Sequence, residues 1–155
     1  MAVRVLFVCL GNVCRSPMAE AVFKHMVNEA GLGDEIIVDS AGTSGWHIGE
    51  RAHRGTRHVL QARGIEYEGR ARQITPEDFG EFDYILAMDN SNLADLREMQ
   101  PGGRVVIRRF LDFVEDASTR EVPDPYYDGR FEEVYDLVQT GADALLSHIR
   151  QEKGL

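Results

Sequence analysis

Cysteine is scarce in this sequence: the only two, Cys9 and Cys14, both lie within its first fourteen residues. Two cysteines placed so close together cannot build the disulfide framework of a small secreted protein. Long apolar runs are also missing, since the longest near the N-terminus, residues 5–10, has six residues. Such a run is too short to cross a bilayer and lacks the layout of a secretory signal. These absences predict a soluble, cytoplasmic protein.

Basic residues are few as well: 17 Lys and Arg stand against 26 Asp and Glu, which gives a net charge of −9. An acidic surface repels polyanions, so we expect neither a nucleic-acid partner nor a membrane partner. Any anionic ligand needs a local site strong enough to overcome this field. No repeat and no Pro/Gly/Ser-rich linker divides the 155 residues. The chain is therefore predicted to form a single domain, residues 1–155, large enough to bury its own core.

What the sequence does contain is a regular alternation of apolar segments and amphipathic segments. Apolar runs typical of buried strands occupy residues 3–8, 35–38, 82–88 and 105–107. Apolar residues at helical spacing follow each run, over 17–30, 56–63, 93–99 and 131–149. A turn is predicted at 39–42. Four strand–helix units in a row predict a doubly wound, Rossmann-like α/β domain, with a four-stranded parallel sheet and helices on both faces.

The first predicted strand runs directly into the segment Cys9-Leu10-Gly11-Asn12-Val13-Cys14-Arg15-Ser16-Pro17. Open α/β sheets place their ligands at the carboxyl ends of strands, and a helix N-terminus there attracts anions. Gly11 and Asn12 tolerate the left-handed backbone of a tight loop, and the guanidinium of Arg15 can hold two phosphate oxygens. The glycine spacing and the GK[ST] ending of a Walker loop are absent. The segment therefore predicts a different kind of phosphate-binding loop.

A thiol, Cys9, lies at the base of this loop. The surrounding amides, the helix N-terminus and Arg15 all favour the thiolate over the thiol, and the hydroxyl of Ser16 is placed to help. An isolated cysteine at a strand end is usually no more than a small buried hydrophobe. The arginine six positions further on favours a nucleophile instead.

Three segments together resemble the low-molecular-weight protein tyrosine phosphatases: residues 5–17, residues 82–93 and Asp124-Pro125-Tyr126-Tyr127. The resemblance covers nearly the whole chain, in the order and at the length typical of that family. A Cys-x5-Arg motif alone occurs in several unrelated phosphatase folds, but the late Asp-Pro-Tyr-Tyr segment makes the match specific. The resemblance implies hydrolysis of phosphotyrosine and of small aryl phosphate monoesters through a cysteinyl-phosphate intermediate.

The resemblance also implies a role for each matching residue. Cys9 resembles the nucleophile, and Asp124 resembles the general acid that protonates the leaving phenolate and then activates water. The phosphoryl oxygens are expected to be held by Arg15 and by the loop amides, those of Leu10, Gly11, Asn12, Val13, Cys14 and Arg15. No metal or cofactor is implied, because Arg15 and the backbone amides are expected to stabilise the charge on the phosphoryl oxygens, as magnesium does in kinases.

Further residues match supporting positions of the family. Asn12 and Ser16 resemble residues that fix the loop and the thiolate, and Ser40 resembles one that hydrogen-bonds to the loop. Some members carry a histidine near the position of Gly69 that supports the loop, and this chain lacks it. Cys14 matches a thiol that can pair with Cys9 and protect it from irreversible oxidation; simple packing inside the loop is the alternative.

Aromatic residues are expected to form the slot for the substrate ring. Tyr126 and Tyr127 resemble one wall and Trp46 the other, although burial in the core is the usual fate of such side chains. Asp-Pro is also a common turn opener, so Asp124 has a purely structural interpretation. Asp89, which follows the third strand, is a competing acid, and we interpret it as the N-cap of the next helix. The histidines show no metal spacing, and His53 and His58 are expected to be solvated.

Two other functions remain to be weighed. A thiol-redox enzyme of the arsenate reductase type shares the loop, but such enzymes use further cysteines late in the chain, and none follows Cys14. A non-catalytic phosphate-binding module is expected to lack either the thiol or the acid, and both are present. The expected partners are tyrosine-phosphorylated proteins or small aryl phosphates, with inhibition by phosphate-like oxyanions and a monomeric state.

Overall fold

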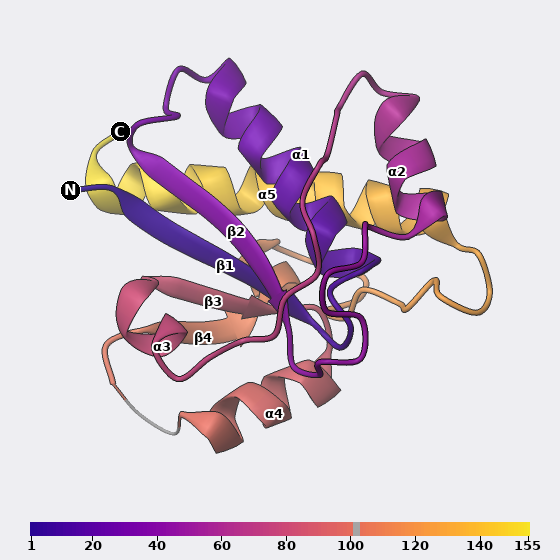
Figure 1. Ribbon diagram of the computed structural model, residues 1–155. Helices are drawn as coiled ribbons and strands as arrows, with labels where there is room; N and C mark the ends of the chain where they lie inside the picture. Colours follow the sequence, from indigo (N-terminus) through magenta and orange to yellow (C-terminus); the bar gives the residue numbers. More distant parts are fainter. Residues whose placement is uncertain (101–102) are drawn as a thin grey trace.

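The computed structural model describes residues 1–100 and 103–155 (Figure 1). Its centre is a four-stranded, all-parallel sheet in the order β2-β1-β3-β4. The strands are β1 (Val3–Cys9), β2 (Ile36–Gly42), β3 (Tyr84–Ala87) and β4 (Val106–Arg109). The predicted parallel α/β sheet is therefore confirmed, including all four strands.

Helices cover both faces of this sheet. They are α1 (Arg15–Glu29), α2 (Arg54–Gln61), α3 (Asp78–Glu81), α4 (Asn90–Met99) and α5 (Phe131–Lys153), together with the 3-10 turn η1 (Phe110–Phe113). Helices α1, α2 and α5 pack on one side, and α3 and α4 lie on the other (Figure 1). The short elements α3 and η1 have four residues each, too few to show helical spacing in the sequence. Among the described residues, none of the helices has the length and apolar composition that a membrane crossing needs.

Strand β1 lies in the middle of the domain, which explains its apolar sequence. Val5 and Phe7 point into the core beneath α1 and α5, whereas Leu6 and Val8 contribute to the core beneath α3 and α4. All four side chains are completely buried. A strand covered on both faces needs apolar residues at every position.

Two predicted boundaries at the carboxyl end of the sheet are wrong. Helix α1 begins at Arg15 rather than Pro17. Proline is tolerated as its third residue, because the amides of the first helical turn have no intrahelical hydrogen-bond partner that proline could remove. The turn predicted at 39–42 is the end of β2, which stays in register with β1 as far as the pair Cys9 and Gly42. A Cβ on Gly42 would lie only 2.8 Å from the carbonyl oxygen of Leu10. Glycine therefore lets β2 run closely alongside the loop that follows β1.

Candidate active site

The loop between β1 and α1 has its carbonyl groups and its amides in different environments. Four carbonyl oxygens accept hydrogen bonds of 2.7–3.0 Å from residues in the 43–56 segment, those of Cys9, Leu10, Val13 and Cys14. The backbone amides of residues 10–15 donate to no acceptor within the described part of the chain. These amides lead into the N-terminus of α1, which has no side-chain cap. The arrangement is typical of an anion-binding loop.

Asn12 gives the loop its shape. Its φ of 57° lies in the left-handed region, as expected, whereas Gly11 has no positive φ, so that part of the prediction is wrong. The Asn12 carbonyl oxygen Oδ1 accepts a hydrogen bond of 3.0 Å from the backbone amide of Arg72. Its Nδ2 donates to Ser16 Oγ at 2.8 Å and to Ser40 Oγ at 3.0 Å. One side chain thereby connects the loop with α1, β2 and the segment around residue 72.

The thiol of Cys9 lies at the end of β1 and is 3% exposed. Its Sγ is 3.0 Å from Ser16 Oγ, and either atom can be the donor. Because Ser16 Oγ already accepts from Asn12, its own proton is available to a Cys9 thiolate. The structure therefore brings Cys9, Asn12, Ser16 and Ser40 together, as the sequence predicts.

Arg15 is buried beside the loop, with 3% of its surface exposed. Its Nη1 donates to Asp89 Oδ2 at 2.6 Å and to the carbonyl oxygen of Val122 at 3.0 Å. Burial opposes the charge of Arg15, but Cys9 and Asp89 outweigh it and raise the pKa of the guanidinium. The other oxygen of Asp89 accepts from the amide of Asn92 at 2.8 Å, which confirms the predicted N-cap. The second role of Asp89, orienting Arg15, is a feature that the sequence analysis missed.

Asp124 lines the same cavity and lies in the segment before α5. Its Oδ1 accepts from the amide of Tyr126 at 3.1 Å, so the turn interpretation is correct. Its Oδ2 is 3.6 Å from Nη2 of Arg15, and 42% of the side chain is exposed. The turn therefore holds one carboxylate oxygen and leaves the other near Arg15, in a side chain that is partly open to solvent.

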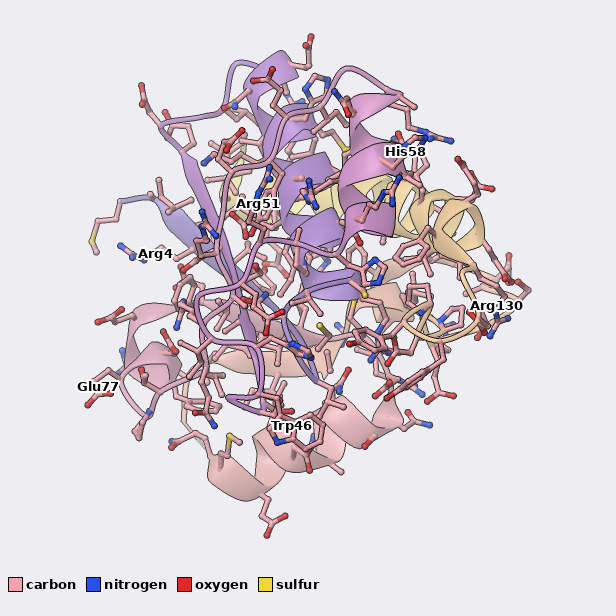
Figure 2. The ribbon with its side chains drawn as sticks, turned by 45° about the vertical axis from the view of Figure 1, so that its right-hand side comes forward. Arg4, Trp46, Arg51, His58, Glu77 and Arg130 are labelled. Atoms are coloured by element: carbon pink, nitrogen blue, oxygen red, sulfur yellow. The ribbon has the colours of Figure 1, made fainter. Side chains whose placement is uncertain are left out.

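A cavity of about 280 Å³ separates the loop from the aromatic residues. The loop residues that line it are Cys9, Leu10, Gly11, Val13, Cys14 and Arg15, and the outer wall is formed by Trp46, His47, Asp124, Tyr126 and Tyr127. Trp46 and Tyr127 are 74% and 92% exposed, so they do not belong to the core. Figure 2 shows Trp46 at the end of the molecule where α4 lies. The three predicted aromatic residues all contact this cavity.

His47 is a cavity residue that the sequence analysis missed. Its Nδ1 is 2.9 Å from Glu50 Oε2, and its ring centroid is 5.8 Å from that of Tyr126. Its position directly after Trp46 was the only signal available in the sequence. The expectation that His53 is solvated is wrong: its ring stacks on Phe131 at 4.9 Å, and burial lowers its pKa. His58 is exposed on α2, as expected (Figure 2).

Cys14 is a second free thiol at the cavity, and it is 3% exposed. Burial, together with the charges of Cys9 and Asp124, raises the pKa of the Cys14 thiol to about 12. It is therefore protonated at neutral pH and does not compete with Cys9 as a nucleophile. Within residues 1–100 and 103–155, no three His, Cys, Asp or Glu side chains are grouped so that they could hold a metal ion.

Fold and cavity together define a class of protein: a parallel α/β domain whose anion-binding loop surrounds a buried thiol at the carboxyl end of β1. The family model described as "Low molecular weight phosphotyrosine protein phosphatase" matches residues 4–155. The chain is also 50% identical over 155 residues to the low molecular weight protein-tyrosine-phosphatase YfkJ of Bacillus subtilis, and the match covers 99% of both.

Solved structures agree with this match. The crystal structure of YfkJ has a TM-score of 0.95 and 49% identity, covering 99% of this chain and 98% of that one. The crystal structure of DARP, described as a Drosophila arginine phosphatase, has a TM-score of 0.89 and 35% identity, covering 94% and 97%. The chain belongs to the low molecular weight phosphotyrosine protein phosphatase family. It is a low molecular weight protein-tyrosine phosphatase.

Proposed function

We propose that this phosphatase works through a covalent cysteinyl-phosphate on Cys9. The thiolate attacks phosphorus, an S–P bond forms and the bond from phosphorus to the phenolic oxygen breaks. Arg15 and the amides of residues 10–15 hold the three equatorial oxygens, whose charge changes in the transition state. The observation that carries this proposal is the set of unpaired loop amides around a buried thiol, beside an arginine oriented by Asp89.

Asp124 is the general acid in the first step. Its proton goes to the phenolic oxygen, which leaves as a neutral phenol, and the resulting carboxylate then takes a proton from the attacking water. The water oxygen bonds to phosphorus, the S–P bond breaks, and the Cys9 thiolate and inorganic phosphate are released. The position of Asp124 supports this assignment, because the side chain lines the cavity, is 42% exposed and has its Oδ2 3.6 Å from Arg15.

The substrate ring binds between Trp46 on one side and Tyr126 and Tyr127 on the other. The rings of Tyr126 and Tyr127 meet edge to face at 4.8 Å, which gives the slot a stiff wall. An aryl ring offers such walls far more contact than a short alkyl group. This supports phosphotyrosine in proteins, and small aryl phosphates, as substrates.

The supporting roles follow from the hydrogen bonds around Asn12. The Ser16 hydroxyl stabilises the Cys9 thiolate, and Asn12 and Ser40 hold the loop in its left-handed shape. The reaction requires no metal and no cofactor, because the positive charge and the donors come from Arg15 and the backbone. Phosphate-like oxyanions such as vanadate inhibit by occupying the same donors.

Cys14 acts as the redox partner of Cys9. When peroxide oxidises the Cys9 thiolate to a sulfenic acid, the Cys14 thiol displaces water from it and a disulfide forms. Both thiols are buried and line the same cavity, which supports this pairing. Mass mapping of peroxide-treated protein tests this role: a Cys9–Cys14 link supports it, and a sulfinic acid on Cys9 without a link contradicts it.

The remaining expectations concern the state of the protein. We expect residues 1–155 to fold as one domain, to be a monomer and to work in the cytoplasm. Light scattering at increasing concentration tests the monomer, because a mass that rises toward twice 17.4 kDa would contradict it.

A substrate panel tests the proposed function directly. The purified protein is assayed with one peptide carrying phosphotyrosine, phosphoserine or phosphoarginine at the same position; the last is included because one relative is described as an arginine phosphatase. We expect kcat/KM to be highest for phosphotyrosine by at least about tenfold, because only its ring fills the aromatic slot. Equal values for phosphotyrosine and phosphoserine would contradict the aryl slot.

A further inference from the structure

Outside the set of residues that line the cavity, the carboxylate of Glu20 accepts two hydrogen bonds on one oxygen. Ser40 Oγ donates to Glu20 Oε1 at 2.5 Å, and the phenol of Tyr67 donates to the same oxygen at 2.9 Å. Glu20 lies on α1, Ser40 on β2, and Tyr67 in the segment between α2 and α3. Neither Glu20 nor Tyr67 lines the cavity, so both act only through other residues.

The protons available to these groups fix the direction of each hydrogen bond. The two protons of Asn12 Nδ2 go to Ser16 Oγ and to Ser40 Oγ. Each serine therefore accepts from Asn12 and has a single proton left to donate. Ser40 gives its proton to Glu20, and Ser16 gives its proton to Cys9. The network thus runs outward from the Asn12 amide to an anion at each end, the Glu20 carboxylate and the Cys9 thiolate.

The charged form of Glu20 keeps this direction. Burial raises the pKa of Glu20, and the hydrogen bonds from Ser40 and Tyr67 offset only part of that rise. Asp39 on β2 further disfavours the charge, and Lys24 on α1 favours it. A protonated Glu20 would itself become a donor and compete for the oxygen of Ser40, which would disturb the bond from Asn12. Tyr67 is thus one of two neutral donors that hold Glu20 as an acceptor.

Gly69, which has no side chain, leaves space for the phenol of Tyr67. A Cβ built on Gly69 would overlap the hydroxyl of Tyr67, so only glycine at residue 69 lets the phenol reach Glu20. Three residues further along the same segment, the amide of Arg72 donates to Asn12 Oδ1. This segment therefore supports Asn12 at both ends of its side-chain network.

We propose that Tyr67 is a positioning residue of the phosphatase reaction: through Glu20 and Ser40 it orients Asn12, and so keeps the Ser16 hydroxyl directed at Cys9. The proposal rests on Cys9 being the nucleophile. The Tyr67 hydroxyl lies four hydrogen bonds from Ser16, so its effect is on the thiolate and not on substrate contacts. Substrate affinity is therefore left nearly unchanged.

The test is the Tyr67→Phe variant, which removes one oxygen atom. The pH dependence of Cys9 alkylation by iodoacetamide reports the thiolate without any turnover. We expect its midpoint to move upward by about half a unit to one unit, the equivalent of one weakened hydrogen bond. The acid limb of kcat is expected to move by the same amount, with an about threefold to tenfold loss at acid pH that recovers as the pH rises, while KM stays nearly constant.

Two further variants make the result decisive. Tyr135→Phe is the matched control, because its phenol donates to Gln139 on α5, outside the network, and it is expected to leave the alkylation midpoint unchanged. Gly69→Ala keeps the Tyr67 hydroxyl but displaces it, and it is expected to reproduce the shift of Tyr67→Phe. A folded Tyr67→Phe protein with an unchanged midpoint would overturn the proposal, as would a rate loss that is equal at every pH.

These outcomes are distinct from a failure of the proposed function. If Cys9→Ser still turns over an aryl phosphate, the covalent mechanism itself is wrong. If Cys9→Ser is inactive and Tyr67→Phe behaves as the parent protein, only the positioning role is wrong. Failure of both Tyr67→Phe and Gly69→Ala to fold would also overturn the proposal, because the contact would then serve stability.

Discussion

Two parts of the active site are built in opposite ways. Cys9 and Arg15, at the two ends of the loop between β1 and α1, are each 3% exposed and form hydrogen bonds with Ser16 and Asp89. Tyr126 and Tyr127, in the segment before α5, are 39% and 92% exposed. Cys9 and Arg15 are therefore buried inside the domain, whereas Tyr126 and Tyr127 lie on its surface.

This difference separates the chemistry from the choice of substrate. Donors fixed before the substrate arrives need no reorganisation as charge develops, so the buried loop suits the step common to all phosphate esters. An exposed segment tolerates sequence changes, and its side chains determine which substrate groups fit beside the phosphate. Substitutions in the loop are therefore expected to damage turnover of every substrate, and substitutions at 124–127 to discriminate between substrates.

The largest effect is expected for Cys9→Ser. Without the thiolate no covalent intermediate forms, and turnover of an aryl phosphate should fall by at least about 10⁴-fold. The loop amides and Arg15 are retained, so calorimetry should still detect binding of phosphate or vanadate. Residual activity above about one percent of the parent protein would be hard to reconcile with covalent catalysis.

Arg15→Lys comes next. Lysine keeps the charge but not the planar fork that pairs with Asp89 and with two phosphoryl oxygens. A loss of kcat/KM on the order of 10²–10³-fold is expected, similar for phosphotyrosine and for activated aryl phosphates. A loss below tenfold would show that the charge alone is sufficient and would weaken the contrast between the two regions.

Asp124→Asn is expected to affect substrates unequally. Esters with poor leaving groups should lose about 10²-fold or more in the rate of the first step, because they need the proton, and activated esters much less. Single-turnover rates across a series of substituted phenyl phosphates measure this slope. An equal loss on all esters would remove Asp124 as the general acid.

Tyr127→Ala tests the exposed wall alone. Loss of one aromatic contact, about 0.5–1.5 kcal/mol, should raise KM for aryl phosphates roughly twofold to twelvefold. The inhibition constant of inorganic phosphate serves as the control and should stay the same. If both constants rise together, the two regions are not independent.

A change in stability, not in catalysis, is expected at Asp78, which binds the side chain of Arg72, the residue whose amide donates to Asn12. Burial tends to raise the pKa of Asp78, but hydrogen bonds from Arg72 and Thr75 outweigh burial and lower it. A carboxylate with a lowered native pKa contributes stability that is present above its unfolded pKa of about 3.9 and is lost as the pH falls through the native value. Asp78→Asn should therefore cost about 1–2 kcal/mol in unfolding at pH 7, and less below pH about 4. A cost that does not vary with pH, measured by urea unfolding, would contradict the ion pair with Arg72.

The strands and the phosphate-binding loop could be predicted from the sequence because their signals are local. An apolar run predicts a buried strand, and the order of residues 9–17 indicates an anion-binding loop before a helix. The end of β2 was misjudged because Asp39-Ser40-Ala41-Gly42 has the composition of a turn, and only pairing with β1 makes it a strand.

Long-range contacts account for the rest of what was missed. Arg15 and Asp89 are 74 positions apart, yet they follow neighbouring strands β1 and β3 whose carboxyl ends meet. The predicted parallel sheet could have indicated this contact. The sequence interpretation of Asp89 covered only its role as an N-cap and not its ion pair with Arg15. The contact of Tyr67 with Glu20 had no comparable signal, because it depends on the path of an irregular segment and on the absence of a side chain at Gly69.

The most direct test of the central claim is to trap the intermediate. The Asp124→Asn variant, with no base to activate water, is mixed with an activated aryl phosphate, denatured within milliseconds and mapped by mass spectrometry. We expect the peptide containing Cys9 to gain the mass of one phosphoryl group, and this gain to disappear in the Cys9→Ser variant. Turnover without any phosphorylated Cys9 peptide, or with the phosphoryl group on another residue, would contradict it.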